Sequence, residues 1–416
     1  MRRHRAFVLA AALAACGGKA PPPQPPAPAP VPDTGAKPTP PPSPAPAPPV
    51  TPPPARLRAP VRLALVGDIN LGTLSLRDGV PPDSGRGLLD AARPALTGDL
   101  VVGNFEGALG DSGMTYKCGR QGRAVGYQAQ RDSLARPVPP APRRRRATPP
   151  RGRPPGPGCY AFLTPPAMAQ RLADAGFTHL NLANNHANDF GPEGRATTDS
   201  AFAILGIRLY GPLGRIAVDS VRRGDSLTVV GLIGFTTYPF AYDLLDLERS
   251  VAVVDSIRPL VDLLVVTFHG GAEGASAVHT GEVAESLGAE PRGDLRTWAR
   301  AVIDAGADVV VGHGPHVLRG IEYYRGAPVV YSLGNFLTYR GFNLEGPLGI
   351  TAVLRLDWSP GGRLGARLIP MVQRPGAGPA PDPLKRAIRQ VRRLSDEDFL
   401  ATGASVSPDG HITPLP

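Results

Sequence analysis

Four apolar runs of this sequence lead directly into polar residues that can bind metals or polar oxygens. The runs are typical of buried strands. With the residues that follow them they read VRLALVGDIN, THLNLANNHANDFG, DLLVVTFHGGAE and ADVVVGHGPH. The second, residues 178–191, carries Asn184, Asn185, His186 and Asp189, which are residue types that favour caps and turns over helix interiors. We therefore expect strands whose ends meet at one rim, where loops present these side chains.

Segments with helical patterns alternate with the strands. Helices are predicted at residues 87–96, 165–176, 192–205, 245–260 and 293–305. Strands are predicted at residues 61–66, 99–103, 178–183, 207–210, 227–235, 262–268 and 307–311. Three further strands, at residues 329–333, 350–357 and 364–372, follow without helices between them, and a basic helix over residues 383–394 comes last. The alternation predicts an α/β fold with a mostly parallel sheet, and the late strands add a mixed or second sheet.

The first 60 residues have the composition of an export signal and a tether. Residues 1–15 contain three arginines, the apolar run AFVLAAALAA and a small-residue end, as a secretory signal does. Cys16 follows directly, which resembles a bacterial lipobox with Cys16 as the lipidated first residue; an ordinary signal peptide is the alternative. Residues 16–60 are rich in proline and are expected to be a disordered tether. The apolar run is too short to span a bilayer, so we expect a lipid-anchored envelope protein on the periplasmic or outer-surface face.

The positive charge is concentrated in one segment. Residues 117–158 hold eleven Lys or Arg and one acid, a balance equal to the chain's net charge of +10. This segment is also proline-rich and poor in aromatic residues, so residues 119–158 are predicted to be a disordered, solvated insertion. The lack of aromatic residues argues against a nucleic-acid partner. Cys118 and Cys159 bracket the insertion and, in an exported protein, are expected to form a disulfide.

The polar residues after the strands form a candidate metal-ligand set. A pair of divalent cations needs nitrogen and oxygen ligands from several loops, including a carboxylate that can bridge. Asp189 and Glu273 are candidates to orient such ligands. A metal pair would suit phosphoester hydrolysis, and the lack of Cys leaves Mn, Fe, Zn or Mg open. The candidate ligands are Asp68, Asn104, Glu106, Asn185, His186, His269, His313 and His316.

For four other polar residues the sequence gives weaker support for a functional role. His179 is interpreted as a wall residue of its strand, and His279 as a loop residue. Glu322 would either bind substrate or cap a segment, and the sequence leaves both open. Asn335, in YSLGNF, is expected to order its loop.

Six motifs resemble, in order, those of the CapA family of bacterial capsule or poly-γ-glutamate synthesis proteins, which is related to calcineurin-like metallophosphoesterases. They are GDINLG, GNFEGAL, NLANNHANDFG, HGGAE, GHGPHVLRGIE and YSLGNF. The resemblance implies a four-layer α/β/β/α sandwich over residues 61–375, with a metal centre at the strand ends. Residues 376–416 are expected to form a C-terminal helix and tail. The residues that match family motif positions are Asp68, Asn185, His186, His269, His313 and His316.

The chain departs from the calcineurin-like pattern at three places. Asn70 stands where those enzymes have a histidine, and GNFE replaces Gly-Asp-x-x-Asp, with Glu106 as the expected substitute. The last motif has the spacing His-x-x-His in place of His-x-His.

The resemblance implies a role in the synthesis, export or trimming of an extracellular anionic polymer, either poly-γ-glutamate or a capsular polysaccharide. If the domain is catalytic, it would be a metal-dependent hydrolase with His186 and His269 as proton carriers. The alternatives are a non-catalytic scaffold that binds the polymer or holds a capsule synthase or export complex, and a periplasmic metallophosphatase.

Overall fold

The structure is a computed structural model that describes residues 57–117, 122–127 and 160–416. The predicted signal peptide, Cys16 and its lipid, nearly all of the tether, most of the insertion, and the Cys118–Cys159 pair lie outside the described residues. Within the described ranges, no helix is both long and apolar enough to cross a membrane.

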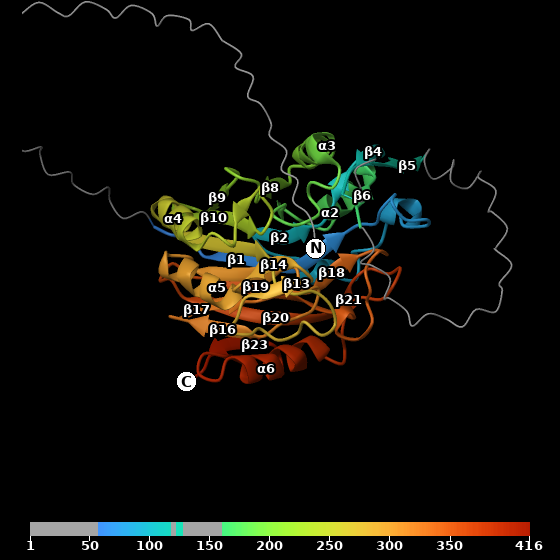
Figure 1. Ribbon diagram of the computed structural model, residues 1–416. Helices are drawn as coiled ribbons and strands as arrows, with labels where there is room; N and C mark the ends of the chain where they lie inside the picture. The colour runs from blue at the N-terminus through green and yellow to red at the C-terminus, as the bar shows by residue number, and fades with distance from the viewer. Residues whose placement is uncertain (1–56, 118–121, 128–159) are drawn as a thin grey trace, which may run out of the picture. The chain divides into compact units, whose positions relative to one another are not determined.

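The first sheet is built around β1 (Val61–Asn70), and Figure 1 shows it in the middle of the fold. The sheet has ten strands in the order β22-β23-β20-β19-β1-β2-β7-β8, with β18 beside β1 and β21 beside β20. β1 runs parallel to β2, β7 and β8 on one side, and antiparallel to β19 on the other. The other strands are β2 (Leu100–Phe105), β7 (His179–Asn181), β8 (Arg208–Tyr210), β18 (Asn335–Thr338), β19 (Ile350–Trp358), β20 (Leu364–Val372), β21 (Ala380–Pro381), β22 (Ala404–Val406) and β23 (His411–Pro414).

The second sheet has seven strands in the order β11-β10-β12-β15-β17-β16, with β9 beside β10. β10, β12, β15 and β17 run parallel to one another, so their carboxyl ends lie at one edge, as predicted for a sheet that carries a site. The strands are β9 (Ala217–Arg223), β10 (Ser226–Thr236), β11 (Tyr242–Asp243), β12 (Leu263–His269), β15 (Val309–His313), β16 (Ile321–Tyr324) and β17 (Ala327–Val330).

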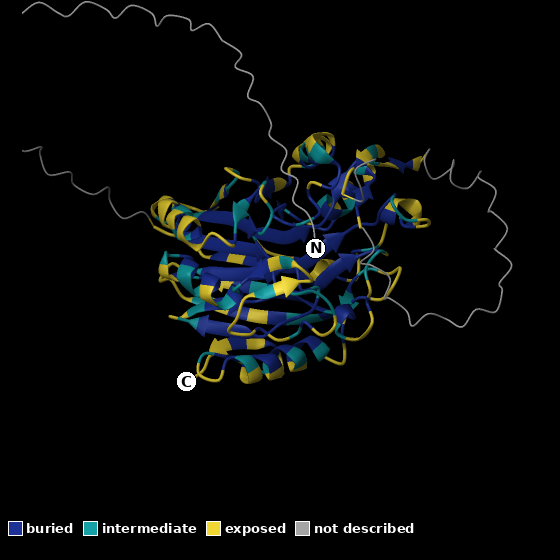
Figure 2. Ribbon diagram, viewed as in Figure 1, coloured by how far each residue is buried: buried dark blue, intermediate teal, exposed yellow. Residues whose placement is uncertain are grey.

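The two sheets pack face to face, and helices cover their outer faces. Leu65 of β1 and Val265 of β12 belong to one buried apolar cluster that includes strands of both sheets. A second cluster joins the first sheet to α2 (Gln170–Asp174) and α3 (Gly191–Ile204), and a third joins the second sheet to α4 (Leu247–Ile257) and α5 (Leu295–Asp304). Figure 2 shows the strands buried and the outer helix faces exposed. The predicted four-layer α/β/β/α sandwich is confirmed.

Residues 87–96 do not form the predicted helix. Their backbone makes 3₁₀-type bonds, such as Asp90 N to Gly87 O, and only Arg93–Ala95 is a short 3₁₀ helix, η2. Gly87 has φ +79, a conformation that glycine adopts freely, and Pro94 has no N–H to donate. These two residues explain why the helical pattern is not realised. The other 3₁₀ helices are η1 (Pro82–Gly85), η3 (Pro166–Ala169), η4 (Arg258–Leu260) and η5 (Gly346–Gly349).

Two other segments, the predicted insertion and the C-terminal tail, also contain strands that were not expected. Within the predicted disordered insertion, β5 (Arg123–Gly126) pairs with β4 (Ser112–Thr115). The predicted C-terminal tail carries β22 and β23, which extend the first sheet, and Ile412 lies in the apolar core between the sheets. The C-terminal helix α6 (Arg386–Asp398) buries Ile388 and Val391 in the same core. Besides the β4–β5 pair, two small strand pairs remain in the described residues. They are β3 (Ala108–Leu109) with β6 (Leu163–Thr164), and β13 (Glu285–Leu287) with β14 (Glu290–Gly293).

Glu322, whose role the sequence left open, lies in a buried network of hydrogen bonds and ion pairs. Its carboxylate is fully buried and accepts bonds from Arg300, Thr402 and the Tyr331 hydroxyl. Thr402 belongs to the C-terminal segment, so the network ties that segment to β16. Glu322 therefore has a structural role.

His179 provides a pH-dependent contribution to stability. Its side chain is buried in β7, and burial lowers its pKa to about 4, although Asp219 at 3.4 Å opposes the shift. An unfolded histidine titrates near 6.5, so the unfolded chain binds more protons between these values and stability falls as the pH drops from about 6.5 to about 4. Between pH 7 and pH 4.5 we expect the free energy of unfolding to fall by about 2 kcal/mol less in His179→Gln than in wild type. Urea unfolding at the two pH values gives the measurement. The exposed His411→Gln should leave the loss unchanged, and an equal loss in wild type and His179→Gln would contradict the assignment.

Candidate functional site

Asp68 lies at the junction of three strands near the end of β1. It is opposite Asn104 of β2 and Asn335 of β18, and its own backbone N–H bonds to Gly334 O at 2.9 Å. The approach of this segment is so close that a Cβ on the neighbouring Gly67 would lie 1.8 Å from Gly334 O. This contact explains why the first and last motifs both carry glycine.

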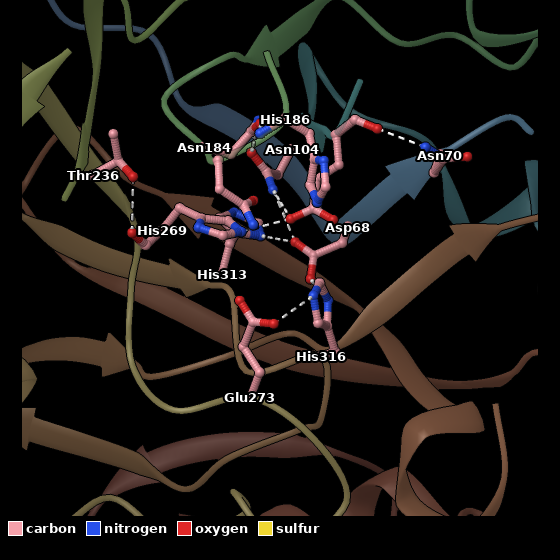
Figure 3. Close-up of polar contacts among 12 residues, drawn as sticks. Asp68, Asn70, Asn104, Asn184, His186, Thr236, His269, Glu273, His313 and His316 are labelled. Atoms are coloured by element: carbon pink, nitrogen blue, oxygen red, sulfur yellow. Dashed lines mark hydrogen bonds and ion pairs between the residues drawn. The ribbon is translucent and has the colours of Figure 1, made fainter. Parts of the chain in front are cut away.

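The fully buried carboxylate of Asp68 is surrounded by groups from both sheets. Asn104 Nδ2 donates to Asp68 Oδ1 at 2.9 Å, and His316 Nδ1 lies 2.9 Å from Oδ2. His313 Nδ1 is 3.3 Å from Oδ1. Figure 3 shows Asp68 between Asn104 and the histidines of the second sheet. The polar residues that follow strands 61–66, 99–103, 262–268 and 307–311 therefore do converge.

Glu106 joins the cluster from the loop after β2. Its Oε1 lies 2.6 Å from His269 Nε2, and both side chains are fully buried. His269 at the end of β12 stands opposite His313 at the end of β15, while His316 follows three residues later with φ +60. A positive φ is uncommon for a residue other than glycine, and here it occurs at the residue whose ring contacts Asp68.

The cluster has the composition and the unsatisfied atoms of a cation site. One ligand atom each from Asp68, Glu106 and His316 lie within 4.8 Å of one another, and all three residues are buried. Glu106 Oε2 and His269 Nδ1 are buried without a hydrogen-bond partner in the described part of the chain. Buried polar atoms are normally satisfied, and carboxylate oxygens with imidazole nitrogens are common ligands of divalent cations. The residues present therefore fit a metal ion.

Burial and mutual contacts shift the pKa of each cluster member. Burial alone would raise the pKa of Asp68, but contacts with His313 and His316 outweigh it and hold that pKa well below its usual range. Burial raises the pKa of Glu106 well above its usual range, and the charge of Asp68 adds to the effect. Burial opposes a charge on His316, yet Glu106 and Asp68 raise its pKa to about 10. Burial, reinforced by Arg292, lowers the pKa of His269.

Glu273 lies at the edge of the cluster and is held by a buried arginine. Its Oε2 is 3.9 Å from His316 Nε2, and its Oε1 receives a 2.6 Å bond from Arg292 Nη2. The Arg292 side chain is fully buried and also bonds to Gly271 O and Glu290 Oε1. Arg292 thus holds the Glu273 carboxylate beside the His316 ring.

His186 is organised by a separate set of contacts. Its Nδ1 lies 2.8 Å from Asp189 Oδ2, and its ring packs 4.3 Å from the Phe162 ring. Lys117 Nζ bonds to Asp189 Oδ1 at 2.7 Å and to Asn185 O at 2.8 Å. Burial lowers the pKa of His186, although Asp189 opposes the shift. Asp189 therefore contacts the His186 ring directly. The grouped ligand atoms around Asp68 do not include His186.

Asn104 holds Asp68 and does not offer a ligand oxygen. Asn184 Oδ1 accepts from the backbone N–H groups of His186 and Ala187, so Asn184 Nδ2 must donate, and it bonds to Asn104 Oδ1 at 3.0 Å. Asn181 Nδ2 donates to the same oxygen. Asn104 therefore presents its N–H group to Asp68. This placement corrects the predicted ligand role of Asn104.

The contacts of Asn185 and Asn70 bear on a ligand role in opposite ways, because the Asn185 oxygen has no hydrogen-bond partner among the described residues whereas Asn70 uses both of its polar atoms. No contact in the described ranges joins the Asn185 side chain to the cluster, and its Oδ1 is buried and unpartnered. Asn70 uses both polar atoms on the backbone, donating to Glu106 O at 2.7 Å and accepting from Gly72 N at 3.0 Å. Asn70 therefore shapes the loop where the calcineurin-like pattern has a ligand. Asn335 Nδ2 bonds to the carbonyls of His316 and Leu348, in the loop-ordering role expected for it.

Three contributors were not found from the sequence. Lys117 looked like the first residue of a solvated basic segment, and Arg292 gave no signal in its loop. Phe162 connects the two halves of the site, because its ring stacks on Phe342 at 5.1 Å and Phe342 lies 5.2 Å from the His316 ring. The contacts of these residues depend on tertiary structure, so no local pattern marks them.

Comparisons with known proteins agree with the motif series. Residues 147–340 match the family described as bacterial capsule synthesis protein PGA_cap. The PGA biosynthesis protein CapA of Bacillus subtilis (strain 168) is 32% identical over 185 residues, which are 41% of this chain and 45% of that protein. The capsule biosynthesis protein CapA of Bacillus anthracis is 30% identical over 188 residues, 41% of this chain and 42% of that protein. The chain thus spans less than half the length of these two curated relatives.

A solved structure aligns more distantly. A Staphylococcus aureus chain named as a 5'-nucleotidase aligns at 13% identity with a TM-score of 0.39, over 82% of this chain and 59% of its own length. The fold assignment therefore rests on the sheet order and the layers described above, not on this alignment.

Removing the charge of Asp68 tests the cation site. We expect Asp68→Asn to weaken binding of a divalent cation at least tenfold, about 1.4 kcal/mol or more, because the variant loses the anionic ligand at the centre of the cluster. Isothermal titration calorimetry and elemental analysis give the measurement. Asp382→Asn is a matched control, since Asp382 is also a buried aspartate but pairs with Arg386. Equal affinity in wild type and Asp68→Asn would rule out the assigned site.

Proposed function

Because this chain belongs to the CapA family of bacterial capsule synthesis proteins, we propose that it acts in the synthesis, export or trimming of an extracellular anionic polymer. Poly-γ-glutamate and capsular polysaccharide are the two candidate polymers. The descriptions of the two relatives, PGA biosynthesis and capsule biosynthesis, support this choice.

The proposal includes an envelope location. Residues 1–15 would direct export, Cys16 would carry the lipid, and residues 16–60 would hold the folded domain away from the membrane. The arginine-led apolar run and the proline-rich composition support this arrangement. A capsule synthase or export complex would then be within reach of the domain.

A hydrolytic role for the domain is supported by one observation above all, the buried cluster of carboxylates and imidazoles. Asp68, Glu106 and His316 would hold a divalent cation, which we propose to be Mn, Fe, Zn or Mg, with His269 and His313 beside it. When bound, such a cation lowers the pKa of a coordinated water and balances charge on a displaced oxygen. The absence of Cys from the cluster fits this catalytic class better than a structural zinc site.

Residues around the cation site have distinct proposed roles in proton exchange, positioning and packing. The N–H group at His186 Nδ1 donates a hydrogen bond to Asp189. Nε2 is therefore the ring atom that remains to exchange a proton with a reacting group. His269 is fully buried and paired with Glu106, which suits holding the carboxylate better than meeting a substrate. Phe162 and Phe342 stack on each other between the rings of His186 and His316 and so connect the two histidines through apolar contacts. Asn104 and Asn335 fix the loops that carry the cluster.

A non-catalytic scaffold is the second candidate. It is favoured by Asn70, whose two polar atoms both bond to the backbone where the calcineurin-like pattern has a metal-binding histidine. A site with fewer ligands could recognise a polymer without cleaving it. A periplasmic phosphatase would share the cluster but act on small phosphoesters.

Cation-dependent hydrolysis separates these candidates. We expect the purified full chain to cleave poly-γ-glutamate or a capsular polysaccharide in the presence of Mn, Zn, Fe or Mg, and EDTA to abolish the activity. His186→Gln should lower kcat about 100-fold or more, in the range of general acid–base effects, with unchanged metal content. Tyr160→Phe, at an exposed aromatic outside the cluster, is the control and should retain activity.

Each alternative predicts a different result in the same assays. A chain that binds metal and polymer but cleaves neither polymer nor a model phosphodiester would be a scaffold. Cleavage restricted to small phosphoesters would identify a phosphatase. A chain that binds no cation would refute the hydrolytic proposal.

A further inference from the structure

The His186–Asp189 pair is reached by a lysine from a separate element. Lys117 follows β4, which forms a hairpin with β5. The hairpin packs beside the His186–Asp189 pair. Val125 of β5 and Phe190 belong to one buried apolar cluster, and a Cβ on Gly113 of β4 would lie 2.8 Å from the Phe190 ring. Phe190 directly follows Asp189 in the chain. Packing of the hairpin therefore fixes where the Lys117 side chain begins.

Asp189 uses both carboxylate oxygens in ways that fix its orientation. Its side chain is 1% exposed, and Oδ1 takes the 2.7 Å bond from Lys117 Nζ. Oδ2 accepts from the backbone N–H of Phe162 at 2.8 Å and faces His186 Nδ1 at 2.8 Å. Lys117 is the one Lys or Arg that pairs with Asp189 among the residues with described positions. A buried carboxylate without a paired cation is costly, so removal of the ammonium would disturb this arrangement.

The contacts also determine the tautomer of His186. An ionised carboxylate only accepts hydrogen bonds, so His186 Nδ1 must carry the proton that lies between it and Asp189 Oδ2. Lys117 Nζ is 3.1 Å from the same Nδ1, but an ammonium also only donates and cannot form a bond there. Lys117 instead bonds to Asp189 Oδ1 and Asn185 O. The result is a neutral imidazole with its lone pair on Nε2.

We propose that Lys117 is a positioning residue for His186 that acts through Asp189. Its ammonium holds the carboxylate in the orientation that accepts the Nδ1 proton, and so leaves Nε2 as the atom offered to a reacting group. Its bond to Asn185 O also fixes the peptide next to His186. The role in turnover rests on the proposed function, in which His186 exchanges a proton, whereas the role in setting the tautomer does not.

A direct substrate-binding role is the main competing explanation for Lys117. Its side chain is 32% exposed, and a substrate anion could take the one N–H that Asp189 and Asn185 leave free. That role would act on substrate affinity and leave His186 unchanged. The positioning role changes the imidazole even without substrate. The two explanations therefore differ in the free protein.

The test compares four forms of the full chain labelled with ¹⁵N-histidine: wild type, Lys117→Met, Lys117→Arg and Arg123→Met. Arg123 is a matched control, because it lies in the same hairpin and bonds to Ser75 O, away from His186. Long-range ¹H–¹⁵N spectra report the tautomer, with the His186 signals assigned from a His186→Gln variant. We expect wild type and Arg123→Met to show the Nδ1–H form alone. Lys117→Met should show a mixture of tautomers, and Lys117→Arg should restore most of the Nδ1–H form.

Kinetics with the metal-loaded protein provide the second measurement. For Lys117→Met we expect kcat to fall about tenfold or more with KM within about twofold, and partial recovery in Lys117→Arg. If Lys117→Met does not fold, Lys117→Gln replaces it, with a smaller change of the same kind in both measurements. A wild-type tautomer in the Met or Gln variant, or a rise in KM alone, would overturn the proposal. A wild-type chain without hydrolytic activity would refute the catalytic function, while the spectra would still decide the role of Lys117.

Discussion

The buried carboxylate of Asp68 is the point at which the two sheets become one site. β1 and β2 supply Asp68 and the amide that holds it, and the second sheet supplies His313 and His316. A fully buried carboxylate needs compensating partners. One partner of Asp68, Asn104, is near it in the chain, but His316 is 248 positions away. Face-to-face packing of the sheets is therefore a condition for the site, and the apolar core between them sets its geometry.

Much of this arrangement was predictable because it depends on local sequence patterns. Apolar runs predict strands, and the carboxyl ends of parallel strands share an edge; these two rules were enough to bring Asp68, Glu106, His269 and His313 together. The same rules missed β9 and the C-terminal strands, whose residues are too polar or too few to show a clear period. They also predicted a helix at residues 87–96, where Gly87 and Pro94 decide the backbone.

The parts that could not be predicted depend on contacts between distant segments. A ligand motif shows which residues carry oxygen or nitrogen, but not which atom of an amide faces the site. Asn104 looked like a ligand by sequence, yet the backbone N–H groups held by Asn184 force the Asn104 oxygen away from Asp68. Lys117 looked like part of a solvated basic run, yet the packing of Val125 and Phe190 brings its ammonium to a buried carboxylate.

The loop that carries Glu273 shows how the fold places a side chain with little secondary structure. Between β12 and α5 the described chain has only the short β13–β14 pair, and two fully buried arginines hold several of its side chains and carbonyl groups. Arg292 bonds to Glu273 and Glu290, and Arg319 bonds to Glu285 and to the carbonyl of Ala277. Buried ion pairs contribute little net stability, because desolvation offsets their attraction. Their geometry is nevertheless specific, since a guanidinium offers its donors in a fixed plane. These arginines therefore act mainly by fixing position, and the 3.9 Å separation between Glu273 and His316 follows from that constraint.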